Sequence, residues 1–507
     1  MSRTLLKKIV FIIFTAGMIF YSQPAMSQPH FDWVRNYPIR GRAAAIDSSG
    51  YVYITGQSTN FYQKILKYDS LGNIIWMKDF NIATGSYYLG LAAYKSRYFY
   101  ITYSNQDHSF GLSKFDTSGT LMWTRNISGY YYEPFCLTLD SSGNVYVSGE
   151  IDFYAANCFT VKYNPQGDTL WRAIYYPSTN GGAYTGRSIS VDNQKNVYIT
   201  GGISYLDFTY SYGTIKYDSL GNRKWISKYY SPYSPYSTAG GGSVKADNKG
   251  NCYVTGVALV NGNGVVSPVT IKYGPNGDSI WTRLFIFQDT IQPSGAYDMA
   301  LDDNDNIYIP CNYTIKYDKN GNQLWYTRNN FYMNRVQIFM NDVYCSGGYW
   351  DPFIKLSGYN NNNGSLLFNV QYSTPYSVIS GGILVHGKNI YHYAYALDSA
   401  ILFKYSSNPS SISENTNESL EFRMHQNFPN PFNSSTTIKY SIKKNSFIKI
   451  QIFDINGREV KTIASEKKSP GDYQVKFEGS GLSSGVYFYS LFADYILIDT
   501  KKLIIVK

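Results

Sequence analysis

The segment KYDSLGNIIW, from Lys67 to Trp76, decides the fold because close copies of it recur along most of the chain. Each copy passes from a short alternating segment through a polar turn, which contains glycine, to a tryptophan. Two alternating segments joined by such a turn predict a β-hairpin. The copies read KFDTSGTLMW from Lys114, KYNPQGDTLW from Lys162, KYDSLGNRKW from Lys216, KYGPNGDSIW from Lys272 and KYDKNGNQLW from Lys316.

A second motif precedes each of these hairpins. Its copies read IDSSGYVYITG from Ile46, LDSSGNVYVSG from Leu139, VDNQKNVYITG from Val191 and ADNKGNCYVTG from Ala246, with a variant, LDDNDNIYIP, from Leu301 and a degenerate copy, AYKSRYFYITY, from Ala93. The aspartate can cap its turn, and glycine accepts a positive φ. Together the two motifs predict a unit of four antiparallel strands, which is the blade of a β-propeller.

The repeat sets the architecture. The tryptophans at 33, 76, 123, 171, 225, 281 and 325 recur at spacings of 43 to 56 residues, a period typical of propellers and solenoids. We expect Trp33, Trp76, Trp123, Trp171, Trp225, Trp281 and Trp325 to fill the wide outer wedges between blades. Eight copies of the second and third strands predict an all-β, eight-bladed propeller over residues 28–407. Seven blades is the alternative, if the weak seventh unit folds differently.

The two ends of the repeat region are complementary. The last unit stops at Tyr405 without a fourth strand, whereas HFDWVRNYP around Trp33 has the pattern of a fourth strand with no unit before it. We therefore predict that the N-terminal strand completes the last blade, which would remove an open sheet edge.

Composition excludes several classes of function. Of the 507 residues only 16% are charged, and 17% are aromatic, including 52 Tyr. The net charge of +10 is scattered rather than clustered, which argues against nucleic acid as a partner. Five cysteines without a CxxC pair and five histidines without ligand spacing predict no disulfide framework, metal or cofactor. Asp302, Asp303 and Asp305 replace a blade turn, which favours a turn over a calcium site.

The N-terminus has the pattern of a signal peptide over residues 1–27. Three basic residues precede an apolar run over 9–21, which is too short to span a bilayer comfortably. Small residues then predict cleavage between Ser27 and Gln28; an N-terminal membrane anchor is the alternative. No later segment has 18 consecutive apolar residues, so we expect no transmembrane segment in the mature chain, which we expect to be monomeric.

The C-terminal part carries no copy of the repeat. Residues 408–421 are polar and predict a linker. Alternating segments over 422–507 predict a second domain, a small Ig-like β-sandwich.

Two resemblances extend these predictions. The repeats resemble the SBBP-type β-propeller repeat of secreted bacterial proteins, a family usually described as seven-bladed. Their pattern of a turn followed by tryptophan is also similar to the tryptophan-docking repeat of quinoprotein dehydrogenases, and this second resemblance concerns the fold alone. The pieces NFPNPFN (427–433), IFDINGREV (452–460), LSSGVYFY (482–489) and KKLIIVK (501–507) closely resemble the type A C-terminal sorting domain of the type IX secretion system. This resemblance implies a Bacteroidota-type Gram-negative cell and Sec export followed by type IX secretion. It also implies the secretion machinery as a partner, and release from the cell or anchoring at its outer surface.

Function is expected on the long aromatic connections that share one face of the ring. We predict a non-catalytic binding protein for a glycan or protein, with ligand contacts from Tyr131, Tyr132, Tyr154, Tyr205, Tyr233, Tyr236 and Trp350. The alternative is a secreted propeller hydrolase or lyase acting on polysaccharide, with acid and base drawn from Glu133, Glu150, Asp152 and Asp351. A purely structural role at the surface is the third reading.

Overall fold

The structure is a computed structural model. It describes residues 19–20, 29–58, 62–83, 90–105, 107–152, 157–177, 182–205, 210–231, 240–259, 266–286, 295–329, 331–396, 399–406, 423–442, 445–454, 459–493 and 496–506. The chain divides into two compact units, Met1–Ser410 and Ser411–Lys507, which we call the ring and the tail sandwich. The predicted cleavage site at Ser27 and Gln28, and the predicted linker, lie outside the described residues.

Six sheets of the ring have four strands each, all antiparallel. They are β3 (Arg40–Ile46), β4 (Val52–Gln57), β5 (Tyr62–Tyr68) and β6 (Ile74–Ala83); β7 (Gly90–Tyr94), β8 (Tyr98–Ser104), β9 (Phe110–Asp116) and β10 (Leu121–Ile127); β11 (Tyr132–Leu139), β12 (Val145–Ile151), β13 (Asn157–Tyr163) and β14 (Thr169–Tyr175); β15 (Gly182–Val191), β16 (Val197–Tyr205), β17 (Tyr210–Tyr217) and β18 (Arg223–Tyr229); β19 (Gly240–Ala246), β20 (Cys252–Leu259), β21 (Val266–Tyr273) and β22 (Ser279–Leu284); and β23 (Ala300–Leu301), β24 (Ile307–Pro310), β25 (Tyr313–Tyr317) and β26 (Gln323–Arg328).

A seventh, larger sheet joins the two ends of the repeat region. It runs in the order β2 (His30–Tyr37), β32 (Ala400–Ser406), β31 (Asn389–Tyr395), β30 (Leu366–His386), β29 (Tyr349–Asn360), β28 (Asp342–Gly347) and β27 (Met333–Phe339), and β1 (Ile19–Phe20) also pairs with β30. The 21-residue β30 serves both halves of this sheet. Divided at β30, the sheet gives two sets of four strands and the ring has eight blades; undivided, it gives seven sheets.

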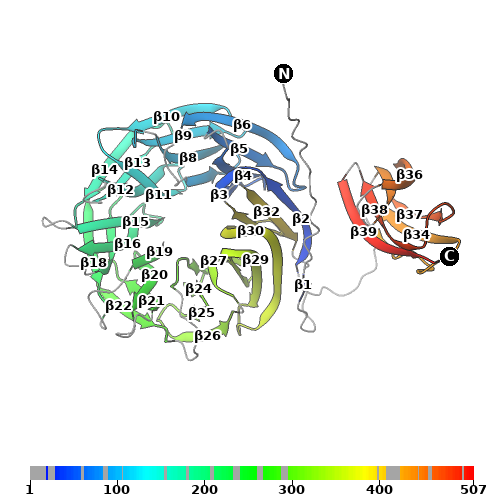
Figure 1. Cartoon of the computed structure of the whole chain (residues 1–507). Coiled ribbons are helices and arrows are strands. Elements are labelled where there is room, and N and C mark those ends of the chain that lie inside the picture. Colours follow the sequence, from blue (N-terminus) through cyan, green and yellow to red (C-terminus); the bar gives the residue numbers. More distant parts are fainter. Residues whose placement is uncertain are drawn as a thin grey trace, which may run out of the picture. The chain divides into compact units, whose positions relative to one another are not determined.

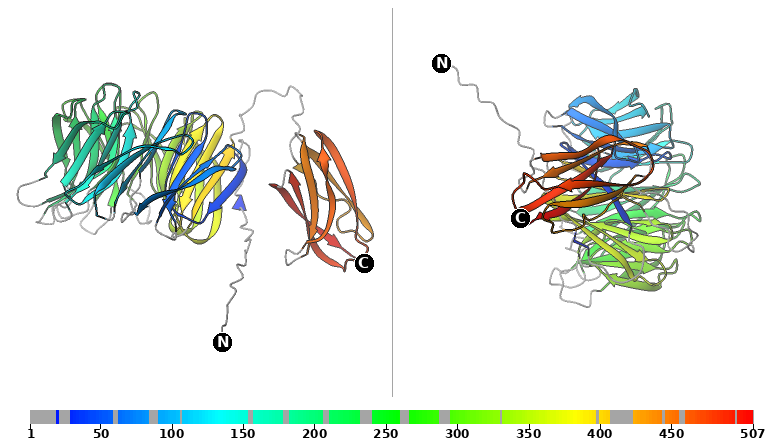
Figure 2. Two further views of the ribbon diagram at one scale, coloured as in Figure 1. Left: turned by 90° about the horizontal axis from the view of Figure 1, so that it is seen from above. Right: turned by 90° about the vertical axis from the view of Figure 1, so that its right-hand side faces the viewer.

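The sheets are arranged in a ring around a central axis (Figure 1), and we call the side of the sheets that faces this axis the channel wall. The first strand of each set lies nearest the axis and the last lies at the rim, and we call these the inner and outer strands. Viewed from the edge of the ring, successive sheets stand side by side (Figure 2). The prediction of an all-β propeller is therefore confirmed, and small residues on inner strands, such as Ala43 and Ala45, suit the crowded centre.

The N-terminal strand does complete the last set of strands, as the sequence predicts. β2 pairs with β32 in antiparallel register, from His30 opposite Ser406 to Tyr37 opposite Ala400. An ion pair of 2.9 Å between Lys404 Nζ and Asp32 Oδ2 reinforces the pairing. The first and last strands of the repeat region therefore pair within one sheet, so the edges that face each other are hydrogen-bonded.

Aspartates fold the tight turns in the way the motif predicts. Asp47 Oδ1 accepts hydrogen bonds from the backbone N–H groups of Ser49 and Tyr51, and Gly50 has a φ of 84°. Asp302 makes the same turn contacts, with its Oδ1 accepting from Asn304 and Asn306 N–H groups. The turn interpretation of the Asp302 segment is therefore confirmed.

Each outer tryptophan docks on the next set of strands. Trp76 Nε1 donates to the carbonyl oxygen of Thr117, 3.1 Å away, and its ring lies against Gly119, which has a φ of 79°. The same bond type joins Trp33 to Ser70, Trp123 to Pro165, Trp171 to Ser219, Trp225 to Pro275, Trp281 to Lys319 and Trp325 to Asn361. A Cβ at the glycine would approach the indole to 2.9 Å, so glycine is required there.

The tryptophans are less enclosed than the wedge prediction implies. Trp281 and Trp325 are buried, at 7% and 8% exposure, whereas the other five keep part of the ring in solvent. The indole lies over a turn at the rim of the ring, where it also meets solvent at these five positions. The junction inside the large sheet has Phe368 at the corresponding position and is bridged by the continuous strand β30 instead.

The tail sandwich contains two sheets around one apolar core. β34 (Ser435–Ile442) pairs with β33 (Arg423–Met424) and β37 (Gly471–Glu478); the second sheet runs β36 (Glu459–Lys468), β35 (Ser446–Phe453), β38 (Gly485–Ala493) and β39 (Ile496–Ile505). Buried residues of both sheets, including Ile438, Ile450 and Leu491, share the core. The predicted sandwich is confirmed.

We expect Trp33→Ala to lower the free energy of unfolding of the ring by about 3 kcal/mol, the lower part of the range for truncating a large aromatic, because Trp33 is partly exposed. Chemical denaturation of the mature chain measures this. Leu220→Ala, at a position 75% exposed, is the control and should change stability by less than about 0.5 kcal/mol. A Trp33→Ala chain as stable as wild type would contradict the docking role.

We expect His392 to make the ring sensitive to acid. Its side chain is fully buried on β31, its Nε2 lies 2.9 Å from Ser380 Oγ, and burial lowers its pKa to about 3. The unfolded chain binds the proton near pH 6.5, so stability falls as pH drops from about 6.5 toward 3. In His392→Val this part of the pH dependence should vanish. Melting temperatures of both chains between pH 7 and pH 4 test it, and parallel curves would contradict it.

Candidate functional site

The long connections of the ring share one face, which we call the loop face. It carries the links from the second to the third strand of each set and from each outer strand to the next inner strand, because the tight aspartate turns all lie at the opposite face. Many of these connections lie outside the described residues, and with them the predicted contacts Tyr154, Tyr233 and Tyr236.

Two predicted loop residues belong to a strand. Trp350 and Asp351 lie on β29, and Asp351 is in register with Val378 of β30. From the sequence, both residues are expected in a free aromatic connection. Instead, the start of β29 pairs with the inner part of β30, which extends the large sheet onto the loop face.

Of the described candidate tyrosines, Tyr132 is fully buried and packs edge-on against Phe159, with ring centroids 5.2 Å apart. It has no surface for a ligand, so we remove it from the candidate set. Tyr131 is partly exposed and stacks on His108 at 4.3 Å between centroids. Neighbouring residues of one Tyr-rich run point to opposite sides of the chain, and the sequence alone did not say which side is the core.

Three exposed tyrosines were missed from the sequence. Tyr130 is 60% exposed, Tyr176 is 63% exposed and Tyr230 is 45% exposed. Tyr230 stacks on the predicted candidate Tyr205 at 6.5 Å, and their hydroxyl oxygens lie 3.3 Å apart. All of them flank loop-face connections of β11–β14 and β15–β18. We call Tyr130, Tyr131, Tyr176, Tyr205 and Tyr230 the tyrosine patch. The signal was available, since Tyr176 and Tyr230 each follow the last residue of an outer strand.

Two candidate carboxyl groups face each other beside this patch. Glu133 of β11 is directly opposite Glu150 of β12 in the strand register. Tyr131 OH donates to Glu133 Oε1 at 2.6 Å. Burial, and then the negative charge of Glu133, raise the pKa of Glu150 to about 7, and Arg187 opposes the shift. Directly opposed like charges destabilise a sheet, so the pair holds a proton or needs a cation.

Asp152, the third described carboxylate candidate, follows β12. Its backbone has a φ of 73°, and its N–H donates to the carbonyl of Tyr131 at 2.8 Å. This contact ties the ends of β11 and β12 together next to the glutamates. Among the described residues, no group of three or more His, Cys, Asp or Glu side chains is arranged to hold a metal ion.

The inner strands carry a recurring β-bulge close to the loop face. The register shifts between Gly41 and Ala43, and at the corresponding point of β11, β15, β19, β27 and β30. Bulges redirect side chains and are common beside functional sites. Arg42 and Arg187 occupy the bulge in β3 and β15, so the same position brings a cation to the channel wall in two sets.

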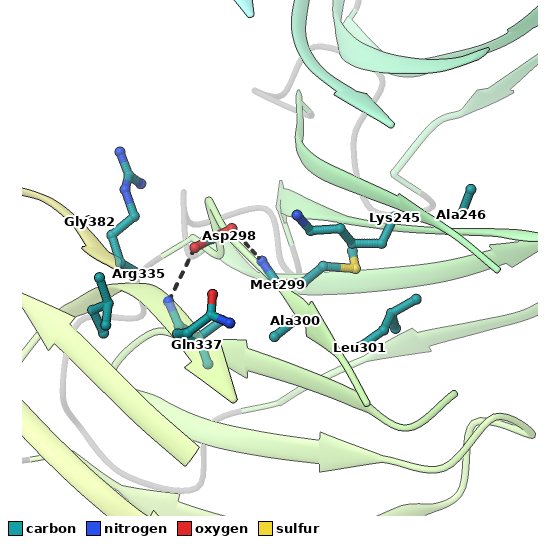
Figure 3. A pocket seen from close by; sticks show the side chains of 11 residues that line it. Lys245, Ala246, Asp298, Met299, Ala300, Leu301, Arg335, Gln337 and Gly382 are labelled. Atoms are coloured by element: carbon teal, nitrogen blue, oxygen red, sulfur yellow. Dashed lines mark hydrogen bonds between the residues drawn. The ribbon is translucent and has the colours of Figure 1, made fainter. Parts of the chain in front are cut away.

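A hollow of about 340 Å³ lies in the channel wall (Figure 3). It is lined by residues of β19, the segment 298–301, β27 and β30, among them Lys245, Asp298, Arg335 and Gln337. Asp298 accepts hydrogen bonds from the backbone N–H of Met299, at 2.9 Å, and of Val336, at 3.1 Å. In the view of Figure 3, Asp298 lies between Lys245 and Arg335. No sequence motif marked these residues, because they come from four separate repeats.

Comparison with known families assigns the tail. Residues 426–506 match the family described as "Secretion system C-terminal sorting domain". The chain therefore carries a type IX sorting domain, which indicates a secreted or cell-surface protein that interacts with the secretion machinery. No curated protein sequence matches the chain. Within the residues that the structure describes, none forms a helix with the length and apolar character needed to cross a membrane.

Solved structures resemble the ring in fold. Sqt1 from Chaetomium thermophilum is 9% identical, with a TM-score of 0.50, and the match covers 76% of this chain and all of the other. A structure described as the Dos1 propeller is 12% identical, with a TM-score of 0.49 and coverage of 74% and 95%. BamB from Moraxella catarrhalis is 11% identical, with a TM-score of 0.39 and coverage of 66% and 85%. At such identities the likeness to Sqt1 shows the propeller fold alone.

We expect one glutamate of the mature chain to titrate near pH 7. In ¹³C NMR of Glu-labelled protein, the carboxyl signal of Glu150 should shift near pH 7 and vanish in Glu150→Gln. In Glu133→Gln its pKa should fall, because the opposing negative charge is removed. Glu478→Gln, on the exposed surface of the tail sandwich, is the control and should leave this titration unchanged. If every glutamate titrates near pH 4.5, the pair is not coupled in this way.

Proposed function

We propose that the mature chain is a non-catalytic binding protein that recognises a glycan through the loop face of its ring. The observation that carries this proposal is the tyrosine patch, in which Tyr130 and Tyr176 keep more than half of their surface in solvent. The sorting domain supports it, because a secreted or cell-surface protein meets extracellular polysaccharide.

The chemistry of the patch suits a sugar. A tyrosine ring offers a flat apolar face and a polar hydroxyl with little rotamer entropy to lose. Tyr205 and Tyr230 are already stacked on each other, so part of the surface is organised before binding. Arg187, exposed on β15 and near enough to Glu150 to oppose the rise of its pKa, adds a hydrogen-bond donor, as hydroxyl-rich ligands require.

The route to the cell exterior completes the proposal. The signal peptide over 1–27 would direct Sec export across the inner membrane, with cleavage after Ser27. The tail sandwich would then direct type IX secretion across the outer membrane of a Bacteroidota-type cell. The mature ring would work outside the cell, released or anchored.

A second candidate function is that of a polysaccharide hydrolase or lyase, and the glutamate pair favours it. A carboxyl group with a pKa of about 7, directly opposite a second carboxyl group, is the arrangement that acid–base cleavage of a glycosidic bond uses. Glu150 would be the acid and Glu133 the base or nucleophile. Asp152 lies beside them and would act as a further carboxylate.

A glycan array and a degradation screen on the mature chain test both candidates. We expect binding to at least one polysaccharide without release of reducing ends. Tyr176→Ala and Tyr230→Ala should each weaken it by about tenfold, since one stacked aromatic ring contributes on the order of 1 kcal/mol beyond its buried area. Tyr326→Ala, on an outer strand and 43% exposed, is the matched control and should leave glycan binding unchanged.

The outcomes separate the candidates. If no glycan binds, or if all three tyrosine variants bind alike, the proposal fails. If polysaccharide is cleaved and Glu133→Gln and Glu150→Gln each abolish cleavage, the second candidate replaces it. Melting curves of each variant establish that the ring is intact.

A further inference from the structure

The hollow in the channel wall has the two cations and the fixed carboxylate of an anion site. Lys245 and Arg335 come from β19 and β27, and Asp298 comes from the segment between them. Because both carboxylate oxygens of Asp298 accept backbone N–H groups, this side chain is held in place and its charge is spread. One such carboxylate balances only one of the two cations, which leaves the hollow with a net positive charge.

The two cations are prepared to receive a ligand. Arg335 Nε donates to the Gly381 carbonyl at 2.9 Å, and its Nη1 donates to the Asn334 carbonyl at 3.0 Å. These bonds fix the plane of the guanidinium group. Among the described residues, neither its Nη2 nor the exposed Lys245 Nζ has a hydrogen-bond or ion-pair partner. The planar guanidinium group of Arg335 and the flexible ammonium group of Lys245 together suit a carboxylate or sulfate group.

The rest of the channel wall has the same sign. The inner strands carry Arg40, Arg42, Arg187, Lys245 and Arg335. The acidic residues are Glu133 on β11 and Asp298 in the segment before β23. A cleft lined mainly by one sign of charge concentrates ligands of the opposite sign. The excess of cations along the channel wall therefore directs an acidic ligand toward the hollow.

The backbone of the wall argues against an extended peptide as the ligand. A peptide that adds to a sheet edge needs free N–H groups on that edge. Here Val244 N–H donates to Ser188 Oγ, Ala246 N–H to Ser190 Oγ and Val336 N–H to Asp298. The backbone N–H groups on these inner edges already donate to side chains of the preceding set. An added peptide strand would therefore gain no hydrogen bonds there, whereas a ligand with an acid group can bind the two cations.

We propose that this hollow binds the acid group of an anionic polysaccharide, with Lys245 and Arg335 as its anion ligands and Gln337 at its wall. This inference rests on the proposed glycan-binding function and names the class of glycan. The volume of the hollow lies near the lower end of the range for small-ligand sites, roughly 300–1,000 Å³, so it holds a short stretch of one chain. Carboxylate and sulfate share the chemistry required.

Calorimetric titration of the mature chain tests the proposal. The probes are polygalacturonate for carboxylate, dextran sulfate for sulfate, dextran as the neutral polysaccharide and polyglutamate as an acidic peptide. At 50 mM NaCl we expect one or both acidic polysaccharides to bind. Lys245→Gln and Arg335→Gln should each weaken that binding by about tenfold, the effect of one lost charge-assisted hydrogen bond. Lys224→Gln, an exposed cation on the outer strand β18, is the matched control and should change affinity by less than about twofold.

Each outcome of the titration either supports or overturns the proposal. The proposal is overturned if neither acidic polysaccharide binds, if Lys224→Gln weakens binding as much as the channel variants, or if polyglutamate binds as tightly as the polysaccharides. Lys245 is exposed, so its variant keeps the test valid even where loss of the Arg335 backbone bonds disturbs folding. If neutral glycans still bind and depend on Tyr176, the proposed function stands and only the acid site is wrong.

Discussion

Six junctions of the ring depend on one shared hydrogen-bond acceptor each. The carbonyl oxygen of Thr117 accepts both Trp76 Nε1, at 3.1 Å, and Lys67 Nζ, at 3.0 Å, from the preceding set of strands. A buried or half-buried ammonium group needs such partners, and burial lowers the pKa of Lys67. The lysine, the tryptophan and the turn of the repeat motif are therefore parts of one contact, which explains why they recur together.

The ends of the repeat region show how that contact adapts. At the last junction Trp33 comes from the N-terminal strand, and Lys404 binds Asp32 of the same strand. At the junction inside the large sheet, Phe368 stands at the position of the docked tryptophan, and the unbroken β30 carries the connection. Every junction thus has either a docked indole or a continuous strand.

What the sequence could predict follows from how local the signal is. Turns, strands and docking residues lie within about ten residues of one another, so the motif around Lys67 and Trp76 gave the blade and the repeat gave the ring. The direction of one tyrosine is not local: Tyr132 faces the core and Tyr130 faces solvent because of how β11 packs on β12 and β13. The opposition of Glu133 and Glu150 needed the register, and the hollow needed four inner strands brought together, so neither could be read from spacing. The continuity of β30 could not be predicted, because the sequence in the middle of this strand resembles that of the other connections between strands.

The docking contact also has a direction, since each set of strands presents donors on one side and an acceptor turn on the other. An interface of this head-to-tail kind closes into a ring only if the rotation per unit completes a full circle within one molecule; otherwise it propagates between molecules as a filament. A chain that lacked β2 would lose the donor Trp33, so the carbonyl of Ser70 and the edge of β32 would both be without their partners. The short N-terminal strand therefore supplies the donor that closes the ring within one molecule, and it covers a strand edge that would otherwise be open to pairing with another chain.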